Sequence, residues 1–365
     1  MSEGIYSELK PVWWFLREGK VPAAPKQMQL ILSDLCNQDC SFCAYRMTGY
    51  SSNQMFVGDA EMARYGHNNP KRFLPTPKVY EILEDCARLG ILGIQFTGGG
   101  EPTVHPDHEA IFQKALDLGL KCALVSNGLA WSDSLIPLLR QFAWVRVSVD
   151  AGTKETYAKI RNTPPGSFNK VLKNIGRLAH EIGVGSPSAC ILGVGYVVTP
   201  DNWQEIGIGT ALAKEFGARY IRLSAMFSQD GIEPYRSHYG DMRETIHTAR
   251  ERNECATFAV HDLFGDRIED LEQGSPDYQT CYYQHYNTYV GGDQNVYRCC
   301  VLAYNQRGLL GSLKNQTYAE FLGSTATKDK LGDFDARGCD RCQFNGRNRA
   351  MNYLLGGKPP HAEFP

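Results

Sequence analysis

The sequence predicts an α/β fold built on parallel strands. Two observations predict it: six short runs rich in apolar and β-branched residues, and amphipathic helical segments between them. Repeated strand–helix units of this kind need crossover connections, which give either an α/β barrel or an open sheet. The strands are expected at 28–34, 91–97, 121–127, 142–150, 189–199 and 218–227, and helices at 79–89, 108–118, 168–182 and 203–216.

Polar and glycine-rich segments follow the first four expected strands in order. Cys36 comes directly after the first strand, and a glycine run ending in Glu101 closes the second. Asn127 closes the third strand and Asp150 the fourth. The carboxyl ends of parallel strands meet at one edge in both architectures, so these segments are expected on one rim, where such folds place their chemistry.

Composition excludes several classes of protein. The 365 residues are 42% hydrophobic and 21% charged, which is enough for a sizeable core and excludes wholesale disorder. The net charge of −2 argues against a protein that coats a polyanion, so nucleic acid is not an expected partner. No apolar stretch approaches the roughly 18 residues that span a bilayer. No signal peptide is visible at the start, and a cytoplasmic protein is expected.

The 12 cysteines are the unusual feature. In a reducing compartment this number favours metal ligation or redox chemistry over disulfides. Four of them are scattered singly among apolar neighbours and are expected to be buried, inert thiols: Cys86, Cys122, Cys190 and Cys255. The remaining eight form two groups, one after the first strand and one in the C-terminal quarter.

Cys36, Cys40 and Cys43 form a C-x3-C-x2-C pattern on one loop. Three thiolates suit an iron–sulfur cubane that keeps one iron open for another ligand. The alternative is a structural zinc loop that borrows a distant fourth ligand, although such sites normally use paired C-x2-C knuckles.

The segment 36–43, with an aromatic residue before its third cysteine, resembles the signature of the radical S-adenosylmethionine (SAM) superfamily. With the glycine run and the six strand–helix units, the resemblance covers about residues 26 to 230. It implies that Cys36, Cys40 and Cys43 hold a 4Fe–4S cluster whose open iron is chelated by SAM. Such an enzyme generates a 5′-deoxyadenosyl radical that abstracts a substrate hydrogen.

The resemblance also implies where the methionine and adenine parts of SAM are bound. Gly99, Gly100 and Glu101 would receive the methionine amino group, because glycine lets backbone carbonyls approach closely. Phe42 would lie near the adenine.

Further SAM contacts are expected at the ends of the third and fourth strands. Ser126, Asn127, Ser148 and Asp150 are the candidates for the ribose. Arg161 is the candidate for the SAM carboxylate, which a guanidinium can bind through two hydrogen bonds. An arginine on a helix surface is the alternative interpretation of Arg161.

The C-terminal group supplies enough thiols for a second, fully ligated cluster. Cys281, Cys299, Cys339 and Cys342 are its expected ligands, with a β-hairpin turning at 291–293 and a short helix at 317–321. This pattern resembles the Twitch auxiliary-cluster module, the short relative of the SPASM domain. A four-cysteine zinc ribbon is the alternative, and the Cys299–Cys300 doublet leaves one ligand assignment open.

Together these features give a partial (β/α)6 TIM-type barrel with a small C-terminal auxiliary-cluster domain. The expected boundaries are an N-terminal extension at 1–25, the radical SAM barrel at 26–235, a connecting helix/strand segment at 236–278, the Twitch-like domain at 279–356 and a tail at 357–365. The segment 44–76 is expected to be an ordered lid or substrate loop.

The pattern is similar to 2-deoxy-scyllo-inosamine dehydrogenase-type enzymes. That similarity implies oxidation or rearrangement at a hydroxylated carbon of a small polar metabolite, with the auxiliary 4Fe–4S cluster as electron acceptor and a flavodoxin- or ferredoxin-type reductant. An epimerase, with the spare thiol of the doublet as hydrogen donor, and a peptide-modifying enzyme are alternatives. Outside the class, the alternatives are an iron–sulfur electron carrier or sensor and a zinc-stabilised binding module. No catalytic residue is singled out.

Overall fold

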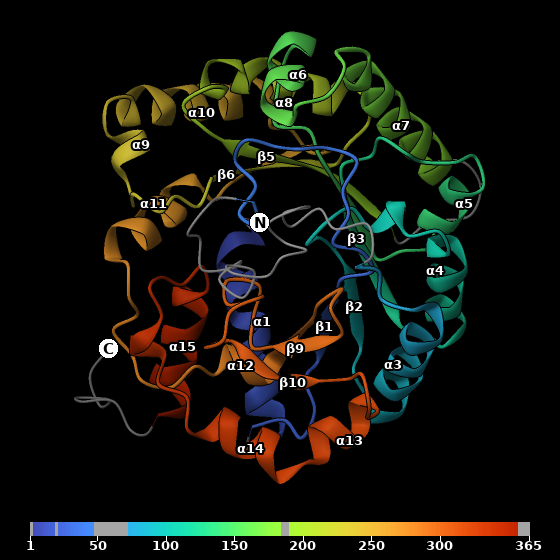
Figure 1. The fold of residues 1–365 in the computed structure, drawn as a ribbon. Coiled ribbons are helices and arrows are strands. Elements are labelled where there is room, and N and C mark those ends of the chain that lie inside the picture. Colours follow the sequence, from blue (N-terminus) through green and yellow to red (C-terminus); the bar gives the residue numbers. More distant parts are fainter. Residues whose placement is uncertain (1–2, 19–20, 47–71, 184–189, 357–365) are drawn as a thin grey trace.

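The computed structural model describes residues 3–18, 21–46, 72–183 and 190–356, and it contains one ten-stranded sheet. The strand order is β10-β9-β8-β1-β2-β3-β4-β5-β6-β7, with β1 to β7 parallel. Helices surround the sheet in a ring (Figure 1). The strands are β1 (Gln27–Leu30), β2 (Gly93–Phe96), β3 (Lys121–Ser126), β4 (Trp144–Ser148), β5 (Ile191–Val198), β6 (Tyr220–Ala225), β7 (Ala259–Asp262), β8 (Asn287–Val290), β9 (Asn295–Tyr297) and β10 (Leu309–Ser312).

The α-helices alternate with the first seven strands, and further helices lie among the strands of the C-terminal segment. They are α1 (Glu3–Glu18), α3 (Thr76–Leu89), α4 (His108–Asp117), α5 (Leu135–Leu139), α6 (Lys154–Arg161), α7 (Gly166–Gly183), α8 (Ile206–Glu215), α9 (Glu233–Arg236), α10 (Tyr239–Asn253), α11 (Phe264–Gln273), α12 (Tyr283–Tyr286), α13 (Tyr318–Gly323), α14 (Thr325–Gly332) and α15 (Asn345–Leu355).

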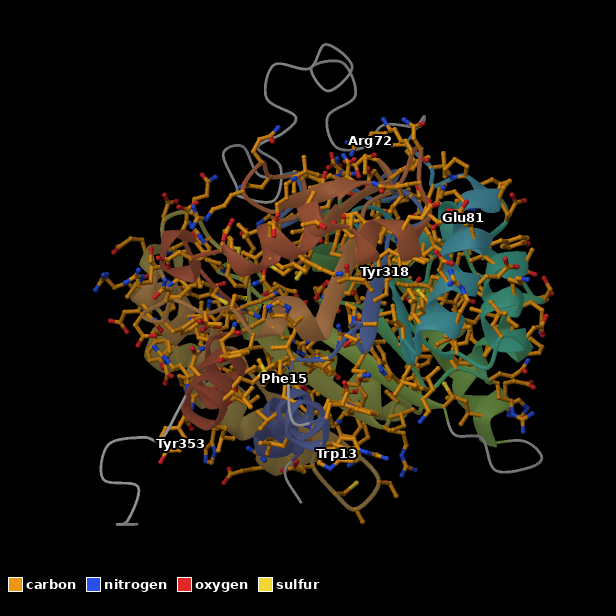
Figure 2. All side chains as sticks on the ribbon, turned by 90° about the horizontal axis from the view of Figure 1, so that it is seen from below. Trp13, Phe15, Arg72, Glu81, Tyr318 and Tyr353 are labelled. Atoms are coloured by element: carbon orange, nitrogen blue, oxygen red, sulfur yellow. The ribbon has the colours of Figure 1, made fainter. Side chains whose placement is uncertain are left out.

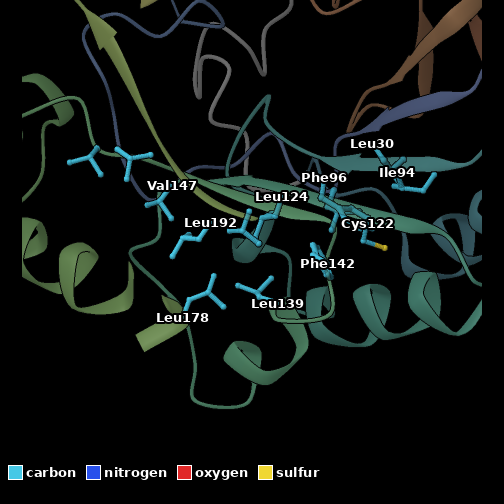
Figure 3. Close-up of a cluster of buried hydrophobic side chains, with 14 of the residues drawn as sticks. Leu30, Ile94, Phe96, Cys122, Leu124, Leu139, Phe142, Val147, Leu178 and Leu192 are labelled. Carbon is cyan, nitrogen blue, oxygen red and sulfur yellow. The ribbon is translucent and has the colours of Figure 1, made fainter. Parts of the chain in front are cut away.

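The main core lies between the sheet and the surrounding helices. Alternate residues of β2, β4 and β6 point toward the helices and are buried, because successive side chains of a strand face opposite sides. Figure 3 shows this layer, in which Phe96, Leu124 and Val147 from three strands pack beside Phe142 and Leu178. The residues between them face the inner side of the sheet, and most of these on β4 and β6 are only half-buried.

The expected fold class is confirmed: a parallel α/β sheet with a C-terminal antiparallel hairpin. The hairpin is β8–β9, and its turn contains Gln294 in the left-handed region at φ 66°. The helix expected at 317–321 is α13, which begins with a capping box between Thr317 and Glu320. The segment expected as a helix/strand connection supplies a seventh parallel strand, β7.

The C-terminal hairpin is part of the same sheet as the barrel. Strand β8 pairs in parallel with β1, so that Met28 aligns with Thr288 and Leu30 with Val290. This pairing joins residues about 260 positions apart in the chain, and local sequence patterns carry no signal for it. As a result, the segment holding the second cysteine group is fixed directly to the strand that leads into the first cysteine loop.

Helix α1 packs against α15 and the second cysteine group. Val12 and Phe15 lie in one buried cluster with Tyr283, Phe344 and Met351, and Phe15 meets the ring of Tyr282 edge-on. Figure 2 shows Phe15 and Trp13 on the side of the molecule opposite Arg72. Because Arg72 lies beside the end of β1, α1 covers the side away from the expected rim.

Three of the four scattered cysteines are buried as expected, namely Cys86, Cys122 and Cys190. The expectation is wrong for Cys255, which is exposed in the turn between α10 and β7. Its flanking residues are mostly polar, so no apolar layer forms around it. Among the described residues, none of the helices has the length and apolar content needed to cross a bilayer. Most of the expected lid at 44–76 and the tail at 357–365 lie outside the described residues.

Candidate active site

The first cysteine loop rests on the C-terminal end of α6. The backbone N–H of Asp39 donates to the carbonyl of Arg161 at 3.1 Å, and that of Ser41 donates to the carbonyl of Ile160 at 2.9 Å. The last carbonyls of a helix have no partner inside the helix, so the loop satisfies two of them. Within the loop, the N–H of Cys43 donates to the carbonyl of Cys40 at 3.1 Å. The three thiols are therefore carried by a loop that is anchored to a helix end.

The glycine run lies against the start of this loop. The N–H of Gly100 donates to the carbonyl of Ser33 at 2.9 Å, and that of Glu101 donates to the carbonyl of Leu35 at 2.9 Å. A Cβ on Gly100 would stand only 2.1 Å from the Leu35 carbonyl oxygen. Glycine is required at this position because two backbone segments touch there.

Glu101 is buried and its carboxylate organises the ends of β2 and β3. Its Oε1 accepts from the Thr103 hydroxyl at 2.7 Å and from the Ser126 hydroxyl at 2.7 Å. Its Oε2 accepts from the backbone N–H of Asn127 at 2.7 Å. The Ser126 hydroxyl also accepts from the indole N–H of Trp131 at 3.1 Å. The side chains of Glu101 and Ser126 are thus hydrogen-bonded to other protein groups. Their contacts with SAM stay predictions.

Asn127 connects the end of β3 to the cysteine loop. Its amide Nδ2 donates to Asn37 Oδ1 at 2.6 Å and lies 3.9 Å from the Cys36 sulfur. A donor this close to a ligating sulfur would stabilise its negative charge. The structure therefore brings one predicted ribose contact to the expected cluster.

Asp150 and Arg161 form a buried ion pair behind the same loop. Arg161 also donates to Gln38 Oε1 at 2.8 Å, and Gln38 donates to the Tyr157 hydroxyl at 2.8 Å. Asp150 accepts from the backbone N–H of Val197 at 2.6 Å and has φ 60°. Arg161 is therefore a buried residue and not the surface arginine of the alternative interpretation.

Two of the remaining predicted SAM contacts are Phe42 and Ser148. Phe42 packs partly buried against the core, with its ring 5.8 Å from the guanidinium carbon of Arg161. Ser148 is the last residue of β4, half-buried, and aligned with Gly195 of β5. Sequence patterns did not single out Gln38. The only sequence feature that could have indicated Gln38 is its position between Cys36 and Cys40.

The protein environment favours the protonated form of two thiols of the first cysteine group. Burial, followed by the charge of Glu101, raises the pKa of the Cys36 thiol to about 12. Burial, followed by the neighbouring Cys40, raises the pKa of Cys43 to about 11. Thiolates at such sites need the positive charge of a metal. The donor set, with three thiols on a loop beside a glycine contact, fits a cubane with one open iron.

The second cysteine group surrounds one cavity in the C-terminal segment. Its lining includes the four expected ligands and the ring of Phe334, and Tyr278 donates to the sulfur of Cys342 at 3.4 Å. Arg298 lines the same cavity and donates to Gln284 Oε1 at 2.5 Å. The four cysteines in the lining are Cys281, Cys299, Cys339 and Cys342.

Cys300 does not belong to that lining. Its sulfur accepts from Gln343 Nε2 at 2.5 Å, and its side chain packs between two buried clusters, one containing Tyr289 and Tyr304 and the other containing Tyr283 and Phe344. Of the doublet, Cys299 thus lines the cavity and Cys300 does not. No three cysteine, histidine, aspartate or glutamate side chains of the described ranges are arranged around a single metal ion. A cubane has a different requirement, because each thiolate binds its own iron.

The sequence of this chain is similar to those of several known proteins. The family model described as Radical SAM superfamily matches residues 30–207, which hold the first cysteine loop and the rim. Over 197 residues the chain is 27% identical to the AdoMet-dependent heme synthase of Methanosarcina barkeri, covering 53% of this chain and 49% of that protein. Over 269 residues it is 25% identical to a probable GTP 3′,8-cyclase of Pyrobaculum aerophilum, covering 68% of this chain and 76% of that protein.

A solved structure shows a similar arrangement. SuiB of Streptococcus suis, bound to its precursor peptide SuiA, superposes with a TM-score of 0.60 and 12% identity, covering 89% of this chain and 70% of SuiB. At this identity the likeness concerns the fold alone. The chain spans about half the length of the heme synthase that it matches, 49%. Residues 30–207, which carry the cysteine loop and the glycine contact, are thus the part of the chain that matches the radical SAM superfamily.

Proposed function

We propose that this chain is a radical SAM oxidoreductase that oxidises a hydroxylated carbon of a small polar metabolite. The 5′-deoxyadenosyl radical takes a hydrogen atom from that carbon, the hydroxyl proton is released, and the remaining electron passes to a second 4Fe–4S cluster. The observation that carries the proposal is the cavity lined by Cys281, Cys299, Cys339 and Cys342. Four thiols complete the ligation of a cubane and leave no iron open to substrate, which suits an electron acceptor.

The residues around that cavity support a negatively charged occupant. Burial lowers the pKa of Arg298 to about 10, whereas Cys281, Cys299 and Cys339 raise it. The Tyr278 hydroxyl points at the Cys342 sulfur and would stabilise a thiolate there. Such hydrogen bonds and buried cations set the reduction potential of a cluster.

At the first site, Cys36, Cys40 and Cys43 would hold the cluster that binds SAM. Together these groups supply the radical that removes a hydrogen atom from carbon. The chain contributes the anchored loop, the Gly100 contact and the buried Asp150–Arg161 pair beside it. An external reductant of the flavodoxin or ferredoxin type is part of the proposal.

The test uses the anaerobically reconstituted full chain and a panel of hydroxylated metabolites. We expect 5′-deoxyadenosine together with a carbonyl product that a hydrazine reagent traps. A Cys281→Ser/Cys342→Ser variant should still cleave SAM but form no carbonyl. Carbonyl formation that persists in this variant contradicts the proposal.

The second candidate function is an epimerase. It is favoured by Cys300, whose thiol does not line the cavity and is therefore outside the expected cluster ligation. Solvent deuterium in the product, no carbonyl, and loss of turnover in Cys300→Ser would favour this candidate.

A further inference from the structure

The inner face of the sheet carries two arginines on either side of β5. Arg146 of β4 aligns with Gly193, and Arg222 of β6 aligns with Gly195. In a sheet, aligned residues point to the same face. Their neighbours in sequence, such as Val145 on β4, point to the buried core instead. Both arginines therefore face the inner side of the barrel.

The two glycines of β5 make room for these arginines. A Cβ on Gly195 would lie 3.5 Å from Cδ of Arg146, which shows that the Arg146 side chain extends over this position. A Cβ on Gly193 would collide with the ring of Tyr220, at 2.1 Å. Side chains from β4 and β6 thus come together across a strand that contributes none at these two positions.

Arg222 is surrounded by positive charge. Burial, followed by Arg146 and Arg267, lowers the pKa of Arg222 to about 9, and Arg347 acts in the same direction. Its strongest electrostatic neighbours in the described ranges include no carboxylate. Its Nε is buried without a hydrogen-bond partner among the described residues. Like charges held together away from water destabilise a fold unless an anion joins them.

The cysteine sites do not account for these two arginines. The cations that act most strongly on the first site are Arg46 and Arg161, which affect Cys43. At the second site, Arg267 affects Cys300 and Cys342. Arg146 and Arg222 are not among the strongest neighbours of any of these cysteines in the described ranges.

We propose that Arg146 and Arg222 bind an anionic group of the substrate, a phosphate or a carboxylate, on the inner face of β4 to β6. The inference deepens the proposed function, on which it rests, by assigning the small metabolite a negative charge. Two guanidinium groups supply paired donors that match the oxygens of either anion. Ser148 lies in the same row as Arg222 at the rim, so an anion held here places the rest of the substrate toward the SAM site.

The test measures anion binding to the reconstituted full chain by calorimetry and by its thermal unfolding midpoint. Sodium phosphate and sodium acetate are titrated separately at constant ionic strength, with chloride as the reference. We expect one of them to bind and raise the midpoint, and Arg146→Gln or Arg222→Gln to weaken that binding roughly tenfold or more. Arg219→Gln, an exposed arginine just before β6, is the matched control and should leave binding unchanged.

Without added anion, Arg146→Gln and Arg222→Gln should match or exceed the wild-type unfolding midpoint, because repulsion is removed. Lower midpoints with unchanged anion binding would overturn the proposal and give the arginines a structural role. Loss of SAM binding in both variants would assign them to SAM, and tighter binding of a glutamate-rich peptide than of either anion would assign them to a peptide. SAM cleavage is measured in parallel, so failure of the proposed function is seen separately.

Discussion

Glu101 and Ser126 share a 2.7 Å hydrogen bond that joins the end of β2 to the end of β3. The same carboxylate accepts from Asn127, whose amide lies beside the Cys36 sulfur. A buried carboxylate with several donors is fixed in position, because each unmade bond would leave a polar group without a partner. The geometry of the rim therefore depends on Glu101.

Glu101→Gln should destabilise the protein by about 1–3 kcal/mol, since the new amide would face donors that now meet an acceptor. SAM affinity should fall as well, because Ser126 and Asn127 at the end of β3 lose an acceptor. Chemical denaturation and calorimetry measure the two effects. Glu155→Gln on the exposed surface of α6 is the control and should change stability by no more than ~0.5 kcal/mol. Equal effects of the two substitutions would contradict this role.

Gly100→Ala should displace the cysteine loop, because the added Cβ would stand 2.1 Å from the Leu35 carbonyl. Forced overpacking costs about 1–3 kcal/mol, and we expect SAM binding to be lost with it. Gly207→Ala serves as control, since nothing lies within 4 Å of that Cβ position in α8. It should be neutral or stabilising by up to ~1 kcal/mol. Normal SAM affinity in Gly100→Ala would refute the close-contact argument.

Arg161→Leu should cost about 3–5 kcal/mol of stability, because it leaves the carboxylate of Asp150 buried without its cation. The double variant Asp150→Asn/Arg161→Leu should recover most of this loss, since no charge is then left unpaired. SAM affinity should stay low in both variants if Arg161 binds the SAM carboxylate. Recovery of SAM affinity in the double variant would leave Arg161 with a structural role only.

Stability should depend on pH through His285 of α12. Burial, followed by the charge of Arg298, lowers the pKa of His285 from 6.5 to about 4. Between these values the unfolded chain takes up a proton that the folded chain does not, so stability falls as pH drops from 6.5 toward 4. The loss amounts to at most ~3 kcal/mol. Parallel unfolding curves should show that His285→Gln flattens this dependence and that the exposed His247→Gln does not.

Local patterns predicted much of the fold, and the site residues that they indicated stay predictions. Alternation and strand ends located β1 to β6, and the cysteine spacing located the first loop. The burial of Arg161 was not predictable, because it follows from a long-range pair with Asp150 and from the cysteine loop packing on α6. Sequence alone also could not show that Cys299 lines the cavity and Cys300 does not.

The two arginines of the inner face have a signal in the sequence. Arg146 and Arg222 each stand between apolar residues in strands of period two, where a charge marks the inner face. The pairing of β8 with β1 carried no such signal, because it depends on residues far apart in the chain.

The central claim, two clusters with separate roles, is tested most directly by iron and sulfide per chain after anaerobic reconstitution. We expect about eight irons in the wild type and about four after Cys36, Cys40 and Cys43 are replaced by alanine, with release of 5′-deoxyadenosine abolished. Cys299→Ser should lower the iron content and Cys300→Ser should not. About four irons in the wild type, or zinc in place of iron, would contradict the account.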